Sequence, residues 1–125
     1  MTSRPPVTFH VLDTGSGVPA SNMLVEISHN TSKGDTEPFQ WIKFGECWTN
    51  SDGRGTGLLP DSMREIPVGI YKMKFHTKEY YLQSNTTTFY PFVSNIYYCL
   101  FGIVWYGMVH VWYMYGVILC CSSSN

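Results

Sequence analysis

The sequence predicts an all-β fold, an antiparallel sandwich of two sheets, from three observations. Short segments rich in Val, Ile, Phe, Tyr and Thr recur along the chain, and clusters of Gly, Pro, Ser and Asp separate them. No long stretch shows the periodicity of an amphipathic helix. The 125 residues match the usual size of one domain, so we expect a single sandwich.

The first predicted strands alternate with turn signals. Residues 7–13 form a β-rich segment, and residues 14–19, which contain two Gly and a Pro, end it. Residues 23–28 are the second predicted strand. A polar turn over residues 30–38 leads to a third strand at residues 39–44, where large apolar side chains alternate with polar ones.

A glycine-rich segment follows. Residues 51–57 must be a loop, because three Gly in five residues weaken either helix or strand. Residues 60–65 are compatible with one helical turn. Residues 89–93 begin a further strand, and Pro91 places it at a sheet edge or a strand start.

The clearest strand covers residues 68–75, where apolar and basic side chains alternate with a period of two. This alternation puts the aromatic face of the strand inward, and that face carries Tyr71, Met73 and Phe75.

Charge and cysteine content exclude several classes of protein. Eight Lys and Arg against nine Asp and Glu give a net charge of −1, which provides no basic surface for nucleic acid or an anionic membrane. The four Cys are too few and too irregularly spaced for a secreted disulfide scaffold, and they match no zinc pattern. We therefore expect no nucleic-acid partner and no disulfide framework.

The C-terminal part differs from the rest. Every Asp, Glu, Lys and Arg lies at or before Glu79. Residues 96–121 form an uncharged run that exceeds the roughly 20 residues of a membrane-spanning helix, but Trp and Tyr are scattered through it and His110 lies near its centre. A C-terminally membrane-anchored protein is thus an alternative that composition disfavours. Residues 1–6 lack the apolar core of a signal peptide, so we expect synthesis without export.

Two residues of the predicted sandwich have chemistry of interest. His10 lies inside the first strand between Phe9 and Val11, and Arg54 lies in the glycine-rich loop. A strand His is most often structural, and an Arg in such a loop is usually just solvated. Neither residue identifies a site by itself.

Five segments, taken together in their order and spacing, are more specific than any one motif. They are Thr8-Phe9-His10-Val11-Leu12-Asp13-Thr14, Gly17-Val18-Pro19-Ala20, Thr49-Asn50-Ser51-Asp52-Gly53-Arg54, Gly69-Ile70-Tyr71-Lys72-Met73-Lys74-Phe75 and Phe89-Tyr90-Pro91-Phe92-Val93. With these segments the chain resembles the 5-hydroxyisourate hydrolase family, transthyretin-related proteins of urate breakdown, over residues 7–93. Transthyretin, the hormone carrier with the same fold, lacks both the strand His and the Asp-Gly-Arg turn, so the resemblance points to the enzyme branch.

The resemblance implies a fold, a reaction and a site. The fold is a transthyretin-like antiparallel sandwich with immunoglobulin-like topology. The reaction is hydrolysis of 5-hydroxyisourate to 2-oxo-4-hydroxy-4-carboxy-5-ureidoimidazoline, on the route from urate to allantoin, without metal or cofactor. His10 and Arg54 are the implied catalytic and substrate-binding residues: the imidazole serves as a general base, and the guanidinium binds the planar substrate and stabilises developing negative charge. Relatives form homotetramers in the peroxisome or cytoplasm.

The chain departs from the family pattern after residue 93. The family ends with a strand carrying His-Tyr-His and a terminal Tyr-Arg-Gly-Ser, and this chain has neither, so we assign His110 no catalytic role. The chain therefore divides into an extension (1–6), an incomplete domain (7–93) and an uncharged apolar tail (94–125) that replaces the last strands. We expect a sandwich two strands short, with exposed edges and little or no activity.

Three interpretations of the tail stay open: a membrane segment, packed strands, or translated intron. Val93-Ser94 is what a common intron start encodes in frame, and an ordinary coding exon at this point would contradict that hypothesis. A non-catalytic transthyretin-like binding module or an inactive splice form is the alternative function. The terminal Ser-Ser-Ser-Asn is not a Ser-Lys-Leu-type peroxisomal signal.

Overall fold

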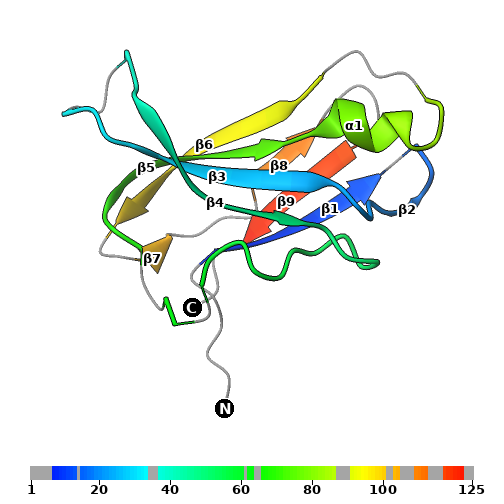
Figure 1. Ribbon diagram of the computed structural model, residues 1–125, viewed down its shortest axis with the longest axis horizontal. Helices are drawn as coiled ribbons and strands as arrows, with labels where there is room; N and C mark the ends of the chain where they lie inside the picture. Colours follow the sequence, from blue (N-terminus) through cyan, green and yellow to red (C-terminus); the bar gives the residue numbers. More distant parts are fainter. Residues whose placement is uncertain are drawn as a thin grey trace.

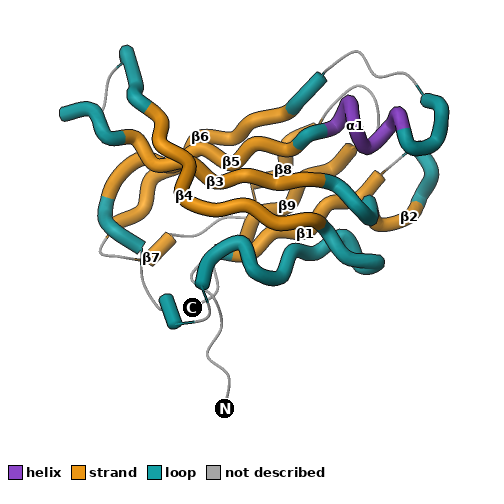
Figure 2. The backbone as a smooth tube through the Cα atoms, in the orientation of Figure 1, coloured by secondary structure: helices purple, strands orange, loops and turns teal. Residues whose placement is uncertain are grey.

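The structure, a computed structural model, describes residues 7–13, 15–33, 37–60, 62–63, 66–86, 91–100, 103–104, 109–112 and 117–122. Its strands form two sheets that pack face to face, with one short helix at the end of the molecule where β2 lies (Figures 1 and 2). The elements are β1 (Thr8–Asp13), β2 (Val18–Pro19), β3 (Leu24–Asn30), β4 (Trp41–Trp48), β5 (Gly69–Phe75), α1 (Thr77–Leu82), β6 (Val93–Leu100), β7 (Ile103–Val104), β8 (Val109–Trp112) and β9 (Val117–Ser122).

The sheet topology confirms the predicted antiparallel sandwich. One sheet has the strand order β2-β1-β9-β8, and the other has the order β4-β3-β5-β6-β7. Each pairing between these named strands is antiparallel. The first described strand thus lies beside the last one.

The core fills the space between the two sheets. Alternate residues of β5 are fully buried, as the period of two predicted: Tyr71, Met73 and Phe75 are each 0% exposed. Phe9 of β1 meets Phe75 edge to face, with ring centroids 5.9 Å apart. Each apolar side chain buried in this way stabilises the fold by about 1.5–3 kcal/mol.

Strand boundaries differ from prediction mainly in β4, which begins and ends later than the predicted 39–44. Gln40 lies ahead of the strand, where its amide donates to Asn30 Oδ1 at 3.0 Å and its carbonyl accepts from Thr31 N at 2.8 Å. These bonds belong to the turn rather than to the ladder. A register shift between Ile27 and Ser28 then lets β4 continue along β3 to Trp48.

Other differences concern short elements. Helix α1 was not predicted, because six residues give too little periodicity to detect. The predicted helical turn over 60–65 lies partly outside the described residues. In the described part, Met63 N donates to the Pro60 carbonyl at 2.9 Å, which closes one hydrogen-bonded turn but no helix. Of the strand predicted from residue 89, Phe89 and Tyr90 lie outside the described residues and β6 begins at Val93.

The tail supplies strands of its own, which corrects the expectation of a sandwich two strands short. β6 pairs with β5 from Phe75↔Val93 to Gly69↔Cys99, and β9 pairs with β1 from Thr8↔Ser122 to Asp13↔Val117. β-branched and aromatic residues are common in these segments and favour strands. In the part of the chain that the structure describes, no helix has the length and hydropathy to cross a membrane.

Asp13 fastens α1 to the end of β1. This carboxylate is 6% exposed and accepts hydrogen bonds from Tyr80 Oη at 2.8 Å, Tyr81 Oη at 3.5 Å and the amide of Gly15 at 3.0 Å. Burial first, and then the negative charge of Asp13, raises the pKa of Tyr81 to about 12. The pKa of Tyr80 is raised by burial and by its bond to Asp13.

These shifts predict a late tyrosine titration. The difference in phenolate absorbance between the wild type and Tyr81→Phe should appear with a midpoint near pH 12 as the pH rises. A free phenol titrates near pH 10 instead. Because the raised pKa favours the protonated folded state, this contribution to the free energy of unfolding is complete below about pH 10 and is lost as the pH rises toward 12. Asp13→Asn should lower the pKa only in part, since burial is the larger cause; a Tyr81 titration near 10 would contradict the assignment.

Candidate functional site

His10 lies on the outer face of the four-stranded sheet. Its neighbours Phe9 and Val11 are 3% and 0% exposed and point into the core, whereas His10 is half-buried. Because successive side chains of a strand point to opposite faces, the imidazole lies on the face away from the core.

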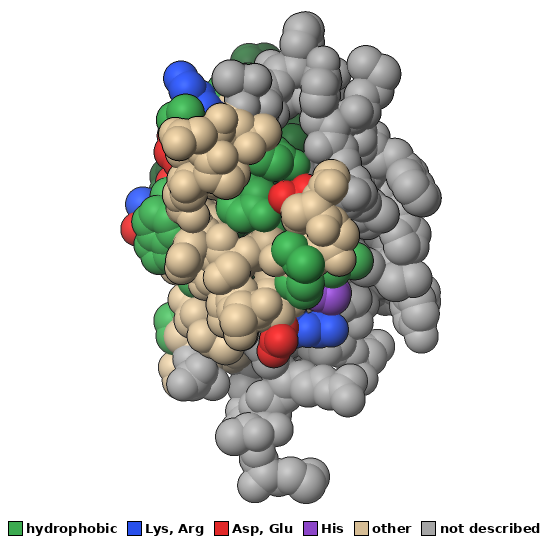
Figure 3. Space-filling view, turned by 90° about the vertical axis from the view of Figure 1, so that its right-hand side faces the viewer, with side chains coloured by type: hydrophobic (Ala, Val, Ile, Leu, Met, Phe, Trp, Pro, Cys, Tyr) green, Lys and Arg blue, Asp and Glu red, His purple; other side chains and the backbone are tan. Residues whose placement is uncertain are grey.

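Arg54 lies directly beside His10. The two residues form an isolated antiparallel bridge that places the glycine-rich loop along β1 where β2, which pairs only with Leu12 and Asp13, leaves the strand unpaired. Residues opposite each other in such a bridge point to the same face, with Cβ atoms about 4.5–5.5 Å apart. The structure thus brings together the two residues singled out in the sequence. The space-filling view from the α1 end shows hydrophobic side chains and a few charged ones on this side of the molecule (Figure 3).

Glycines let the loop lie flat on β1. The carbonyl of Gly53 accepts a hydrogen bond from Val11 N at 2.9 Å, and Gly53 has a φ of +74°, in the left-handed region that favours Gly. A Cβ at Gly53 would collide with the Val11 carbonyl oxygen, and one at Gly55 would collide with the Phe9 ring. The two positions that flank Arg54 therefore need Gly for close approach.

Thr49 anchors the start of the loop. It is 3% exposed, and its hydroxyl donates to the Ala20 carbonyl at 2.7 Å and accepts from Met23 N at 2.9 Å. Thr49 also bridges to Gly55 across the loop. Sequence reasoning missed this role because the partners are distant in the chain; the one available signal was a polar residue at the start of an Asn-Ser-Asp-Gly turn.

The backbone register also places His110. Cys120 of β9 lies opposite His10 of β1, and His110 of β8 lies opposite Cys120. The three residues thus occupy one cross-strand row. Sequence analysis gave His110 no role, and its backbone position is two strands away from His10.

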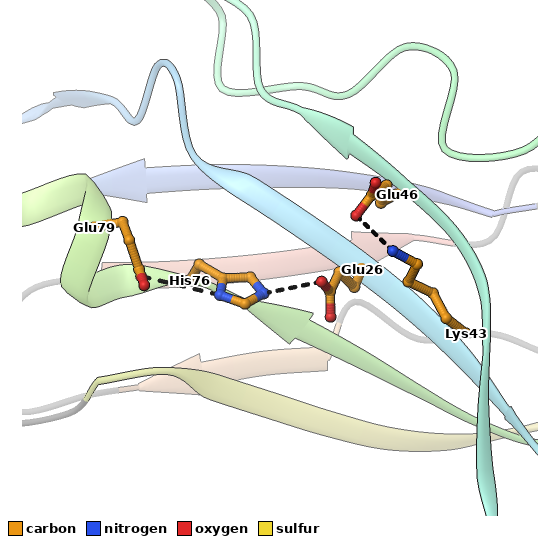
Figure 4. Close-up of polar contacts among 5 residues, drawn as sticks. All are labelled: Glu26, Lys43, Glu46, His76 and Glu79. Atoms are coloured by element: carbon orange, nitrogen blue, oxygen red, sulfur yellow. Dashed lines mark hydrogen bonds and ion pairs between the residues drawn. The ribbon is translucent and has the colours of Figure 1, made fainter.

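A second polar cluster lies on the other sheet and at α1 (Figure 4). His76 Nε2 is 3.4 Å from Glu26 Oε1, and His76 Nδ1 is 3.9 Å from Glu79 Oε2. Lys43 and Glu46 form an exposed pair at 3.0 Å on β4. Among the residues that the structure describes, no group of three or more His, Cys, Asp and Glu can hold a metal. The His76 contacts join the start of α1 to β3, the Lys43–Glu46 pair lies within β4, and none of them belongs to the face that carries His10.

Cys47 is a poor nucleophile. It is 8% exposed, and burial raises the pKa of its thiol to about 11, so the thiol stays protonated at neutral pH. The reactive groups of the described site are therefore an imidazole and a guanidinium.

These two groups suit hydrolysis of a small polar substrate. An imidazole that is neutral near physiological pH accepts a proton from water. The guanidinium presents a planar fork of donors to carbonyl and ring-nitrogen edges and stabilises an oxyanion. The two residues lie opposite each other on the same face of the sheet, so one small molecule can contact both.

Known proteins resemble this chain over most of its length. Residues 7–101 match the model of the HIUase/Transthyretin family. The 5-hydroxyisourate hydrolase of Mus musculus is 36% identical over 96 residues, which cover 77% of this chain and 76% of the mouse protein. That of Schizosaccharomyces pombe, named as probable, is 34% identical over 100 residues, covering 75% of this chain and 77% of the yeast protein.

Among solved structures, transthyretin from Sparus aurata superposes with a TM-score of 0.66 at 24% identity, covering 77% of each chain. At this identity the likeness shows the fold.

Proposed function

The chain belongs to the HIUase/transthyretin family, and from this premise we propose that it hydrolyses 5-hydroxyisourate in the degradation of urate. The observation that carries the proposal is the bridge between His10 and Arg54 on one face of the sheet. Relatives named as 5-hydroxyisourate hydrolases, which are 33–36% identical, support the same reaction.

The geometry suggests how the reaction proceeds. His10 takes a proton from a water molecule, whose oxygen attacks the carbonyl carbon of the cyclic amide. Arg54 stabilises the negative charge that develops on the carbonyl oxygen. The C–N bond then breaks, the proton goes to the leaving nitrogen, and the ring opens to a carboxylate. The proposal needs no metal or cofactor for these steps.

A non-catalytic binding module is the second candidate, and the likeness to Sparus aurata transthyretin favours it only through the fold. His10 and Arg54 favour the enzyme instead, because a binding module needs no imidazole beside a guanidinium. The carrier branch lacks both residues, as the sequence resemblance implies.

Assembly and location belong to the same proposal. By analogy with the family, we propose a homotetramer in the peroxisome or cytoplasm, to be checked by analytical ultracentrifugation and by cell fractionation. Because the terminal Tyr-Arg-Gly-Ser is missing, we expect a lower rate than in relatives that carry it.

The test is to follow the ultraviolet decay of freshly made 5-hydroxyisourate with the purified chain. Decay faster than the uncatalysed rate is the expected result, with the rate proportional to protein concentration. Decay at the uncatalysed rate at every protein concentration would refute activity and favour the binding module, for which calorimetric titration with the substrate analogue urate provides a second readout.

A further inference from the structure

We propose that Asn50 is the positioning residue that holds Arg54 opposite His10. The inference rests on the proposed function, since it assigns Asn50 a part in aiming the substrate-binding guanidinium. Asn50 is exposed and lies at the start of the loop, next to the anchored Thr49.

Asn50 binds both backbone polar groups of Arg54. The side-chain oxygen Oδ1 of Asn50 accepts a hydrogen bond from Arg54 N at 3.1 Å, and the backbone N of Asn50 donates to the Arg54 carbonyl at 2.7 Å. Holding the two peptide groups on either side of Arg54 fixes its backbone dihedrals and hence the direction of its Cα–Cβ bond. That direction decides whether the guanidinium reaches the face on which His10 lies.

Asn50 also closes the rest of the turn, once through its side chain and once through its backbone carbonyl. Asn50 Oδ1 also accepts from Asp52 N at 2.9 Å, and the Asn50 carbonyl accepts from Gly53 N at 2.9 Å. An Asn side chain commonly bonds to backbone amides a few residues on in this way. The single oxygen Asn50 Oδ1 thus accepts hydrogen bonds from two backbone amides of this exposed loop, those of Asp52 and Arg54.

The loop has two independent supports, and only one of them involves the Asn50 side chain. Thr49 and Gly53 fix the loop to the body of the protein through Ala20, Met23 and Val11. Within the loop, the Asn50 side chain adds the bonds to Asp52 N and Arg54 N, whereas the bonds of the Asn50 backbone to Gly53 and Arg54 do not depend on the side chain. Its loss should leave the fold standing and release the orientation of Arg54.

The control variants follow from this division. Asn50→Ala removes the acceptor oxygen, whereas Asn50→Asp keeps an acceptor oxygen at the same place. Ser51→Ala is the matched control, because Ser51 is exposed in the same loop and lies outside the proposed machinery. Thermal unfolding should be nearly the same for all three variants.

The kinetic test is a double-mutant cycle. Asn50→Ala should lower kcat/KM for 5-hydroxyisourate by about 10- to 100-fold, since small errors of placement are costly at a reacting centre, and Asn50→Asp should recover most of the loss. In an Arg54→Ala background the Asn50→Ala change should add almost nothing. Equal losses in both backgrounds, or wild-type kinetics for Asn50→Ala, would overturn the inference.

A spectroscopic readout separates this inference from the proposed function. The imidazole signals of His10 in a ¹H–¹³C NMR spectrum should move in Arg54→Ala, and Asn50→Ala should reproduce much of that movement while Asn50→Asp and Ser51→Ala do not. If every form including the wild type fails to hydrolyse 5-hydroxyisourate, the proposed function fails and the NMR result still decides the inference. His10 signals in Asn50→Ala that coincide with those of the wild type would refute it.

Discussion

Replacement of His10 by Ala should lower kcat/KM for 5-hydroxyisourate by about 10²–10⁴-fold, the range expected when a general base is lost. His10 points away from the core that Phe9 and Val11 fill, so the substitution should leave the fold intact. Unfolding by urea and the far-ultraviolet circular dichroism spectrum should be close to those of the wild type. The loss should therefore appear in the rate of ultraviolet decay alone.

A second His provides the control. His29 stacks on Tyr71 in the five-stranded sheet, with ring centroids 4.6 Å apart, and has no place in the proposed site. His29→Gln should keep the wild-type rate. Wild-type turnover in His10→Ala would show that this imidazole is not the base.

Arg54→Lys should lose most of the activity although it keeps the charge, because an ammonium lacks the planar fork of the guanidinium.

Gly53→Ala should lower the free energy of unfolding by about 2–4 kcal/mol, the largest loss we expect from a single loop substitution. A non-glycine residue is strained at the φ of +74°, and the new Cβ would collide with the Val11 carbonyl oxygen. The loop would have to leave β1, which breaks the bond from Val11 N to the Gly53 carbonyl. Activity should fall as well, because Arg54 moves with the loop.

Gly57→Ala tests the backbone strain in the absence of a collision. Gly57 has a φ of +86°, but a Cβ there would meet nothing within 4 Å. Its substitution should cost only about 1 kcal/mol, the strain alone. Urea unfolding of the two variants gives the comparison, and equal losses would show that close packing against β1 is not what Gly53 provides.

Period and composition predict much of the sandwich. The alternation in β5 correctly predicts that Tyr71, Met73 and Phe75 are buried. It also predicts that Ile70 is exposed, which is wrong, because Ile70 is only 3% exposed. The three Gly around Arg54 correctly predict a loop, because the conformational freedom of Gly is a local property that the sequence alone reveals. The boundaries of β4 are not, because its ladder is decided by β3 and by a turn bond to Asn30.

The candidate site is less predictable. The family resemblance pointed to His10 and Arg54 as site residues. No local pattern, however, predicts that a strand and a loop so far apart in sequence lie side by side. That meeting depends on tertiary contacts, such as those of Thr49 with Ala20 and Met23. Packed strands were one of three interpretations of the tail, and the sequence could not choose among them because the recognised family pattern stops at residue 93.

The position of β9 beside β1 bears on how the protein is made. β1 is the first described strand to leave the ribosome, and its neighbour on one side, β9, is the last. Until β9 is synthesised, that edge of the strand carrying His10 has unpaired amides and carbonyls, which can recruit another chain. We expect this edge to stay unpaired for longer than in a sandwich whose neighbouring strands are also neighbours in sequence.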